Sequence, residues 1–332
     1  MYALVVLNRA LDQRFTYEIG EGMTCEIGMR VSVPFGKSEV TAYVIDVVES
    51  VGETSYTIKP IRRVIDAEPL YGLQEIALAQ WMAHFYVCSE GEALSCMIPG
   101  GRRDVEPPAL AVDEQDAVIS SEQLSEEQKR AITEICTGER QLHYVYGVTG
   151  SGKSEVYLRV AEDVIAQGKQ VIYLVPEITL THQLARQVSR RFKDRVAILH
   201  SGMTPSQRLT AWRRIRKGEV QLAIGARSAV FAPFTDLGLI IIDEEHENSY
   251  KAGNTPRYHA RQIAQKRIQD TCALLIMGSA TPSLEAWHMM DQSLVVRHHL
   301  PNRVGLGSPP QVSVVNMLAE QRVLSRLLVA EM

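Results

Sequence analysis

Short stretches within residues 1–100 alternate apolar and polar positions with a period of two. The alternation runs through Arg30–Gly36 (RVSVPFG) and Val40–Ser50 (VTAYVIDVVES), with glycines beside both. It predicts strands with one buried face, arranged in a small barrel or sandwich. Leu73–Tyr86 instead carries apolar residues at helical spacing and predicts a helix. We therefore expect a small β-rich N-terminal domain over residues 1–100.

From residue 124 onwards, nearly continuous apolar runs alternate with longer stretches of helical spacing, such as Glu155–Gln167 and Pro205–Lys217. The runs predicted as strands are 142–146, 170–175, 196–200, 220–225, 237–243 and 273–279. Apolar strands separated by helices are typical of a mostly parallel sheet covered on both faces. The fold class expected for residues 124–305 is therefore α/β.

Residues 101–123 break both patterns, because paired prolines and many acidic residues replace the periodic apolar positions. This composition predicts a linker. The net charge of −4 argues against indiscriminate coating of DNA, but it leaves a local DNA contact open. We find no apolar run of about 18 residues, so we expect no membrane contact and a cytoplasmic protein. The five cysteines are scattered, which predicts neither disulfides nor zinc within this chain.

The strongest motif is Gly147–Ser154 (GVTGSGKS), which matches G-x-x-x-x-G-K-[ST] between a predicted strand and a predicted helix. Glycines let several backbone N–H groups point at phosphate, and the helix N-terminus adds a positive field. We expect Lys153 to reach the β- and γ-phosphates of ATP and the Ser154 hydroxyl to bind Mg²⁺. The ATP-binding residues predicted here are Gly147, Thr149, Gly150, Ser151, Gly152, Lys153 and Ser154. With this motif, the α/β region is expected to be a RecA-like P-loop NTPase lobe.

The apolar run 237–243 leads directly into two acidic residues, Asp243 and Glu244. A P-loop ATPase needs a second carboxylate beside the metal, at the tip of a neighbouring strand. We expect Asp243 to hold Mg²⁺ and Glu244 to orient and deprotonate the attacking water. Together with Lys153, these two residues are the predicted catalytic group of ATP hydrolysis.

Asp243–His246 (DEEH) resembles the DEXH box of superfamily 2 helicases, and other motifs follow in the order of that family. Gly278–Ser283 (GSATPS) resembles the segment that links hydrolysis to movement between lobes. The resemblance implies coupling roles for three residues, His246, Ser279 and Thr281.

Further segments resemble the nucleotide-base and DNA contacts of the same superfamily. Gln128, in SEEQKRAI, resembles the glutamine that reads adenine. Residues 175–178 (VPEI) and 225–228 (GARS) resemble segments that touch the DNA backbone, which implies a DNA contact for Arg227.

The sequences of these motifs most resemble those of the primosomal replication-restart helicases. The resemblance covers many motifs in residues 124–300 and fewer in the N-terminal region, where it rests on RFTYEI and RVSVPFGK. The resemblance implies an ATP-dependent 3′-to-5′ DNA helicase that recognises stalled or branched forks and initiates primosome assembly. It implies ATP, single-strand DNA-binding protein and primosome proteins as partners. It also implies that the first domain binds the free nascent 3′ end of forked DNA. The residues implied at that end are Phe15, Thr16, Gly36 and Lys59, with Thr16 standing where an acidic residue often occurs.

A polar loop, 248–261 (NSYKAGNTPRYHAR), follows the DEXH box. It resembles the aromatic-rich loop that senses DNA in this family, which implies base stacking by Tyr250 and Tyr258. The alternative is an ordinary helix start, because Pro256 suits a first helical turn.

Helicases of this superfamily bind ATP between two lobes, and the second lobe brings arginines to the γ-phosphate. After Thr281 the sequence shows only a short helix and a basic, apolar tail. We expect residues 306–332 to lead toward a second lobe that this chain lacks, together with the zinc-binding region of the family. Such a chain would bind ATP weakly, hydrolyse it slowly and not unwind DNA alone. Two alternatives stay open: a fork-binding module that does not translocate, and another superfamily 2 DNA translocase.

Overall fold

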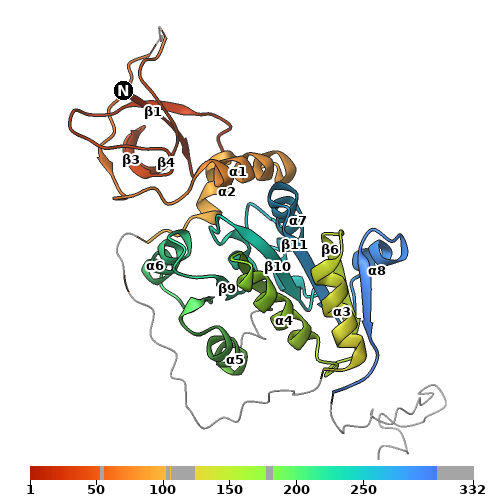
Figure 1. Ribbon diagram of the computed structural model, residues 1–332. Coiled ribbons are helices and arrows are strands. Elements are labelled where there is room, and N and C mark those ends of the chain that lie inside the picture. The colour runs from red at the N-terminus through yellow and green to blue at the C-terminus, as the bar shows by residue number, and fades with distance from the viewer. Residues whose placement is uncertain (53–55, 102–104, 106–123, 177–181, 305–332) are drawn as a thin grey trace, which may run out of the picture.

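The computed structural model describes residues 1–304 apart from 53–55, 102–104, 106–123 and 177–181 (Figure 1). Most of the expected linker and the whole expected tail 306–332 therefore lie outside the described residues. The part of the chain that is described includes no helix with the length and apolar character needed to cross a membrane.

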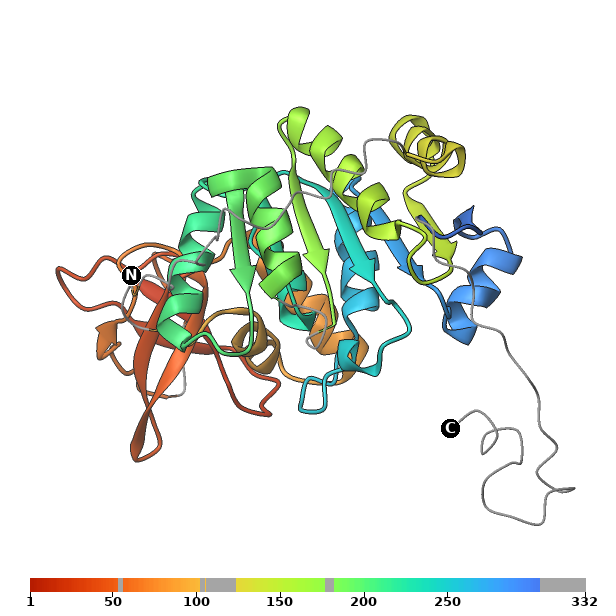
Figure 2. The same cartoon turned by 90° about the horizontal axis from the view of Figure 1, so that it is seen from below.

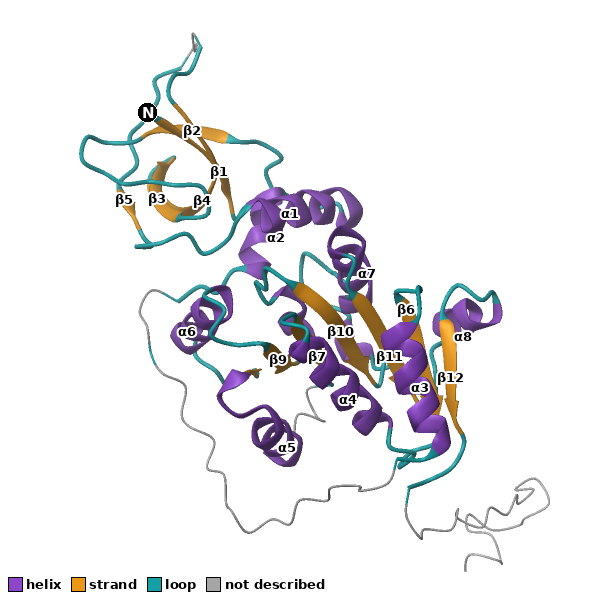
Figure 3. Ribbon diagram, in the orientation of Figure 1, coloured by secondary structure: helices purple, strands orange, loops and turns teal. Residues whose placement is uncertain are grey.

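The first domain is a five-stranded antiparallel sheet with the strand order β2-β1-β4-β3-β5. Its strands are β1 (Tyr2–Leu7), β2 (Phe15–Glu18), β3 (Arg30–Phe35), β4 (Ser38–Val48) and β5 (Arg63–Val64). The Glu18 N–H donates to the Lys59 carbonyl at 3.0 Å, and the Ile61 N–H donates to the Glu18 carbonyl at 2.9 Å. These bonds tie β2 to the segment before β5 and curl the sheet into a small barrel around Val5, Val33 and Val44 (Figure 3). The β-rich domain predicted from the alternation is confirmed.

Two helices, α1 (Leu73–Tyr86) and α2 (Glu90–Met97), connect the barrel with the second domain (Figure 1). The bounds of α1 are those predicted from its apolar spacing. Met82 and Leu94 are buried in one continuous apolar cluster, which also includes barrel and lobe residues. In addition, the Trp212 indole N–H donates to the Leu70 carbonyl at 2.7 Å. The barrel, the two helices and the lobe therefore share one core.

The second domain is a seven-stranded sheet of parallel strands with the order β12-β6-β11-β10-β7-β9-β8. The strands are β6 (Leu142–Gly147), β7 (Gln170–Leu174), β8 (Val196–Leu199), β9 (Leu222–Gly225), β10 (Leu237–Asp243), β11 (Leu274–Ser279) and β12 (Val296–Leu300). The first six correspond to the six predicted runs, so the expected RecA-like α/β lobe is confirmed.

Helices cover both faces of this sheet (Figure 2). One face packs against α3 (Glu126–Thr137), α4 (Lys153–Ala166) and α5 (His182–Phe192). The other packs against α6 (Pro205–Arg216), α7 (Ala260–Thr271) and α8 (Leu284–Asp291), with α1 and α2 beyond them. Because all the strands are parallel, the loops after β6, β10 and β11 leave the sheet at one edge. This edge holds the three motifs that the sequence singled out.

Strand β12 corrects an expectation, because the sequence after Thr281 predicted only a short helix and a tail. The helix is α8, but Val296–Leu300 then adds a seventh strand beside β6. Its sequence, VRHHL, lacks the apolar run of the central strands because β12 lies at the sheet edge. Arg297 and His299 are exposed, whereas His298 is buried. The hydrophobic pattern did not predict this strand, because one of its buried positions is occupied by a histidine and not by an apolar residue.

His298 on β12 and His143 on β6 form a buried pair. The His143 Nδ1 and His298 Nε2 atoms lie 3.0 Å apart. At the other ends of the pair, His298 Nδ1 lies 3.3 Å from a Glu134 carboxylate oxygen, and His143 Nε2 lies 2.8 Å from the Arg140 carbonyl. The two rings share one proton across this contact, which requires at least one of them to be neutral.

Acidification will therefore weaken the wild-type fold more steeply than the fold of a His298→Gln variant. Burial, followed by the charge of His143, lowers the pKa of His298 to about 4, and burial lowers the pKa of His143. As the pH falls below about 6.5, these two histidines take up protons in the unfolded chain but resist protonation in the folded chain. Stability is thus full above that pH and falls below it, by at most about 1.4 kcal/mol per pH unit for each histidine. Urea unfolding at several pH values between about 4 and 6.5 gives the slope of unfolding free energy against pH for the wild type and for His298→Gln. Equal slopes in the two proteins would contradict the role assigned to the histidine pair.

Candidate nucleotide and DNA sites

The predicted phosphate loop lies between the end of β6 and the start of α4, at Lys153. Gly150 and Gly152 have φ angles of +80° and +78°, which favour glycine. A Cβ atom on Gly152 would lie 2.2 Å from Gln128 Nε2, so a larger residue would also collide there. Of the predicted hydroxyl residues, Thr149 is exposed and Ser154 is partly buried. The buried Ser151 Oγ has no hydrogen-bond partner among the described residues.

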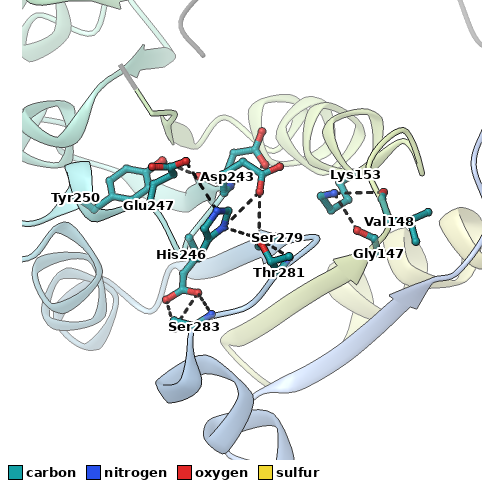
Figure 4. Close-up of polar contacts among 12 residues, drawn as sticks. Gly147, Val148, Lys153, Asp243, His246, Glu247, Tyr250, Ser279, Thr281 and Ser283 are labelled. Carbon is teal, nitrogen blue, oxygen red and sulfur yellow. Dashed lines mark hydrogen bonds and ion pairs between the residues drawn. The ribbon is translucent and has the colours of Figure 1, made fainter. Parts of the chain in front are cut away.

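Lys153 is buried and its ammonium group is folded into this loop (Figure 4). Its Nζ atom donates to the Gly147 carbonyl at 3.1 Å and to the Val148 carbonyl at 3.5 Å. Carbonyl oxygens are neutral acceptors, and a phosphate oxygen forms a stronger charge-assisted bond with an ammonium group. The position suits the predicted exchange of loop carbonyls for phosphate.

Gln128 lies at the start of α3, beside the phosphate loop. Its carbonyl oxygen accepts from the Ser125 N–H at 2.8 Å, in a capping box at the start of α3. Its Nε2 donates to the carbonyls of Ser151 at 3.1 Å and Gly152 at 3.4 Å. Both ends of the amide therefore brace the phosphate loop. Reading adenine by Gln128 stays a prediction.

Asp243 ends β10 across from the phosphate loop. Its carboxylate accepts from the Tyr173 hydroxyl at 3.3 Å and from the Glu244 N–H at 3.0 Å. Burial, followed by the neighbouring Glu244 charge, raises the pKa of Asp243 to about 6, while Lys153 opposes the shift. A bound cation would stabilise the ionised form of a carboxylate that is buried beside another negative charge. Glu244 has a φ of +45°, a left-handed conformation that is unfavourable for a non-glycine residue.

The three predicted coupling residues, His246, Ser279 and Thr281, lie side by side (Figure 4). Ser279 Oγ donates to Glu244 Oε2 at 3.0 Å and lies 2.7 Å from His246 Nδ1. The Thr281 N–H donates to Ser279 Oγ at 3.0 Å. Because the serine hydroxyl has one hydrogen and gives it to Glu244, His246 Nδ1 must carry the proton of the shorter contact. The expected general base and the GSATPS segment thus form one hydrogen-bonded group.

Tyr250 and Tyr258 do not fit their predicted role as base-stacking residues. Tyr250 is 1% exposed, and its hydroxyl donates to the Asp243 carbonyl at 2.6 Å. Tyr258 is 5% exposed, and its ring packs against Phe231 at 4.9 Å between centroids. Both rings belong to the shared apolar core, so neither face is open to a DNA base. The alternative, with Pro256 in a first helical turn, is not borne out either, because α7 begins at Ala260 after an N-cap at His259.

Arg227 lies at a hollow of about 580 Å³ between the loops that follow β8, β9 and β10. Its Nη1 donates to the carbonyls of Ser249 at 3.0 Å and Lys251 at 2.6 Å, and its guanidinium lies over the Tyr258 ring. Arg208 and His200 line the same hollow. Basic groups at a concave surface fit a phosphate backbone. The other predicted backbone segment, 175–178, lies partly outside the described residues.

In the barrel, the structure brings Phe15 and Gly36 together. The Phe15 ring packs edge-to-face on Phe35, with centroids 5.5 Å apart, and Gly36 begins the two-residue turn after Phe35 with a φ of +61°. Thr16 is adjacent on β2. Lys59 is exposed and lies farther along, where its carbonyl pairs with Glu18. Phe15, Thr16 and Gly36 thus share one end of the barrel, and Lys59 lies toward the other end of β2.

Two family profiles match this chain. The PriA profile described as the 3′ DNA-binding domain (3′BD) covers residues 4–99, and the DEAD/DEAH box helicase profile covers residues 125–289. The replication restart protein PriA of Treponema pallidum is 46% identical over 338 residues, covering 98% of this chain and 51% of that protein. The chain belongs to the PriA family.

Another PriA, from Rickettsia conorii, is 34% identical over 94% of this chain and 48% of the relative. The chain thus spans about half the length of the curated relatives it matches. The solved structure of RecG bound to a three-way DNA junction aligns with a TM-score of 0.42 and 24% identity, over 56% of this chain and 25% of that one. That likeness is too weak for any conclusion. The PriA match confirms the resemblance seen in the motifs and assigns a DNA-binding domain and a helicase ATP-binding domain to this chain.

One residue of this PriA-family site was missed by sequence reasoning. Glu245, 2% exposed, accepts hydrogen bonds from the Arg261 guanidinium, from Ser283 Oγ at 2.8 Å and from the Tyr144 hydroxyl at 3.2 Å. It therefore ties the DEEH box to α7 and to the first turn of α8. A third acidic residue in a row was the available signal, because a buried strand rarely continues into three charges without partners.

Proposed function

We propose that this chain is the DNA-end-binding domain and first motor lobe of an ATP-dependent 3′-to-5′ replication restart helicase of the cytoplasm. In this proposal it recognises stalled or branched forks through a free nascent 3′ end and serves the start of primosome assembly. The observation that carries the proposal is the position of Lys153 in the loop after β6 and of Asp243 and Glu244 at the end of β10, on one edge of a sheet whose lobe packs against a barrel that matches the 3′ DNA-binding profile. Single-strand DNA-binding protein and primosome proteins are the proposed protein partners.

The residues present fit Mg²⁺ with ATP. Magnesium prefers oxygen ligands and usually keeps one or two carboxylates beside the phosphates. Asp243 is a buried carboxylate whose pKa is raised by burial, and Ser154 offers a hydroxyl in the first turn of α4. We propose that these two hold the metal, which would neutralise charge on the phosphates. When nucleotide binds, the Lys153 ammonium group would donate to phosphate oxygens in place of the carbonyls of Gly147 and Val148. The zinc region of the family is proposed to lie in the part of the relatives that this chain does not span.

Glu244 is the proposed base for the attacking water. Its carboxylate already accepts a bond from Ser279, so a shift of the GSATPS segment would change how Glu244 is oriented. This gives a physical route by which hydrolysis and lobe movement influence one another. We propose that the chain alone hydrolyses ATP slowly, because arginines from a second lobe contribute about 10³–10⁵ in rate in related enzymes.

DNA contact and the metal site are joined by a short path in the loop after the DEEH box. Arg227 binds the carbonyls of Ser249 and Lys251, and between them Tyr250 binds the Asp243 carbonyl. A phosphate that withdrew Arg227 from these carbonyls would free the peptides on either side of Tyr250. We propose that Tyr250 acts in this relay rather than by stacking on a base.

A Phe15→Ala variant will lose its preference for forks with a free nascent 3′ end. Loss of one stacking platform costs about 1–3 kcal/mol per base. Fluorescence anisotropy with labelled forks measures the effect, using a 3′-hydroxyl, a 3′-phosphate or no nascent strand at one stated salt concentration. Phe15→Leu preserves apolar packing on Phe35 and separates stacking from folding.

Lys153→Ala is the matched control in this assay, because it alters the nucleotide site and leaves the barrel intact. Its preference among the three forks should equal that of the wild type. A Phe15→Ala protein that is folded and still discriminates among the forks would remove Phe15 from the proposed end site.

A further inference from the structure

Residues 301–304 follow β12 and lie against the phosphate loop. Strands β12 and β6 are parallel neighbours, and their last pair is Leu300 with Gly147. Both chains therefore leave the sheet at the same edge, one as the phosphate loop and the other as residues 301–304. The approach is close, because a Cβ atom on Gly147 would lie 2.5 Å from the Leu300 carbonyl oxygen.

A backbone hydrogen bond joins these two segments. The Val304 N–H donates to the Gly150 carbonyl at 2.8 Å, and the next peptide N–H, that of Ser151, donates to the Val148 carbonyl at 3.0 Å. The carbonyl of Gly150 and the N–H of Ser151 belong to one planar peptide group. The two hydrogen bonds hold both ends of this peptide group and so fix the orientation of its plane. Gly150 has a φ of +80°, and without these bonds a glycine could readily adopt other backbone conformations.

Gln128 holds the next part of the loop from the same side. Its amide donates to the Ser151 and Gly152 carbonyls, which fixes the peptides whose N–H groups begin α4. A Cβ atom on Gly152 would lie 2.2 Å from Gln128 Nε2 and 3.2 Å from Val304 Cγ2. Val304 and Gln128 are therefore neighbours on the outer wall of the loop.

Asn302 lies near the start of α3. After the Glu127 backbone N–H and the Ser125 hydroxyl, its side chain makes the smallest contribution to the lowered pKa of the Glu127 carboxyl. The contact of the segment with the phosphate loop is made by Val304. The Val304 N–H and the Asn302 side chain do not belong to the phosphate loop. A bound phosphate therefore does not have to displace them.

We propose that residues 301–304 form a strap that positions the phosphate loop for nucleotide through the hydrogen bond from Val304 to Gly150. The proposal rests on nucleotide binding at this loop. A loop whose Gly150–Ser151 peptide is already held by the Val304 N–H and the Val148 carbonyl loses less conformational freedom when nucleotide binds. By linkage, a nucleotide that favours the ordered loop also favours the closed strap.

Val304→Pro tests the strap, because proline lacks the backbone N–H that binds Gly150. Val304→Ala is the matched control, since it shortens an exposed side chain and leaves the N–H in place. With a fluorescent ADP analogue and Mg²⁺, we expect Val304→Pro to bind about three- to tenfold more weakly than the wild type. Val304→Ala should bind as the wild type does. Without nucleotide, Val304→Pro should melt within a few degrees of the wild type, whereas a role limited to stabilising the fold would lower the melting temperature and leave the affinity unchanged.

Hydrogen exchange of the Val304 amide in the wild type is the second measurement and requires no variant. The amide should be protected without nucleotide and should exchange several-fold more slowly with saturating MgADP. If the wild type binds the analogue and Val304→Pro binds it equally well, the strap is overturned and the nucleotide site stands. An unprotected Val304 amide would also overturn it. If the wild type binds no nucleotide, both the strap and the proposed function fall.

Discussion

An Asp243→Asn variant will lose most of the Mg²⁺-dependent part of its ADP affinity, although its fold will be at least as stable as that of the wild type. In the wild type, burial and the Glu244 charge raise the pKa of Asp243 to about 6, so the ionised carboxylate is disfavoured on folding. For a carboxyl whose pKa rises on folding, stability falls as the pH rises from about 4 to about 6. A neutral amide removes this unfavourable contribution near neutral pH.

The same substitution removes the buried charge on which the proposed Mg²⁺ site depends. We expect the Mg²⁺-dependent part of ADP affinity to fall at least about tenfold, which corresponds to about 1.4 kcal/mol. Calorimetric titration with ADP, in Mg²⁺ and in chelator, measures this part directly. Lys153→Ala is the informative comparison, because it should weaken binding in both solutions by about 1.5–3 kcal/mol, the usual value of a charged hydrogen bond. Retention of the Mg²⁺ effect in Asp243→Asn would show that another residue holds the metal.

Replacing Arg30 by alanine will destabilise the protein by about 3–5 kcal/mol, because it leaves a buried carboxylate without its partner. Arg30 is buried on β3, and its guanidinium forms two bonds with Asp66, at 2.9 and 2.7 Å. The same group donates to the carbonyls of Pro99 and Gly101, each at 2.7 Å. Arg30 therefore joins the barrel to the chain that leaves α2.

An exposed ion pair gives the control for this prediction. Arg14 contacts Glu90 at 2.9 Å, but its side chain is 48% exposed, and pairs of this kind contribute about 0–1 kcal/mol. Urea unfolding of Arg30→Ala and Arg14→Ala compares the two positions in one chain. Similar losses of unfolding free energy would contradict the role assigned to the buried pair. Arg30→Lys should recover little, because lysine cannot form the two-point contact with Asp66.

The nucleotide site was predictable because its geometry follows from spacing. Gly147–Ser154 needs only the strand before it and the helix after it, and a parallel sheet then brings Asp243 to the same edge. Ser279 was placed by resemblance, and its bond to Glu244 agrees with the role implied.

The predictions that failed concern residues whose type suits two environments. Tyr250 and Tyr258 are equally suited to stacking on DNA and to a core, and burial decided for the core. His298 was read as part of a tail, because a polar ring gives no hydrophobic signal even when another histidine pairs with it. Glu245 and Val304 carried no prediction, because their partners lie far away in the chain. For Glu245 the third acidic residue in a row was a local signal, whereas a contact through a backbone N–H, such as that of Val304, leaves none.

The most direct test of the central claim is the affinity of the wild-type chain for a fork with a nascent 3′-hydroxyl, compared with the same fork ending in a 3′-phosphate. Both are measured by anisotropy at one stated salt concentration, because phosphate contacts make affinity depend on salt. The account predicts tighter binding of the 3′-hydroxyl fork, since a chain that recognises a DNA end must distinguish the chemistry of that end. Equal affinity for the two forks would contradict end recognition by the barrel and leave only a nucleotide-binding lobe with an unselective DNA contact.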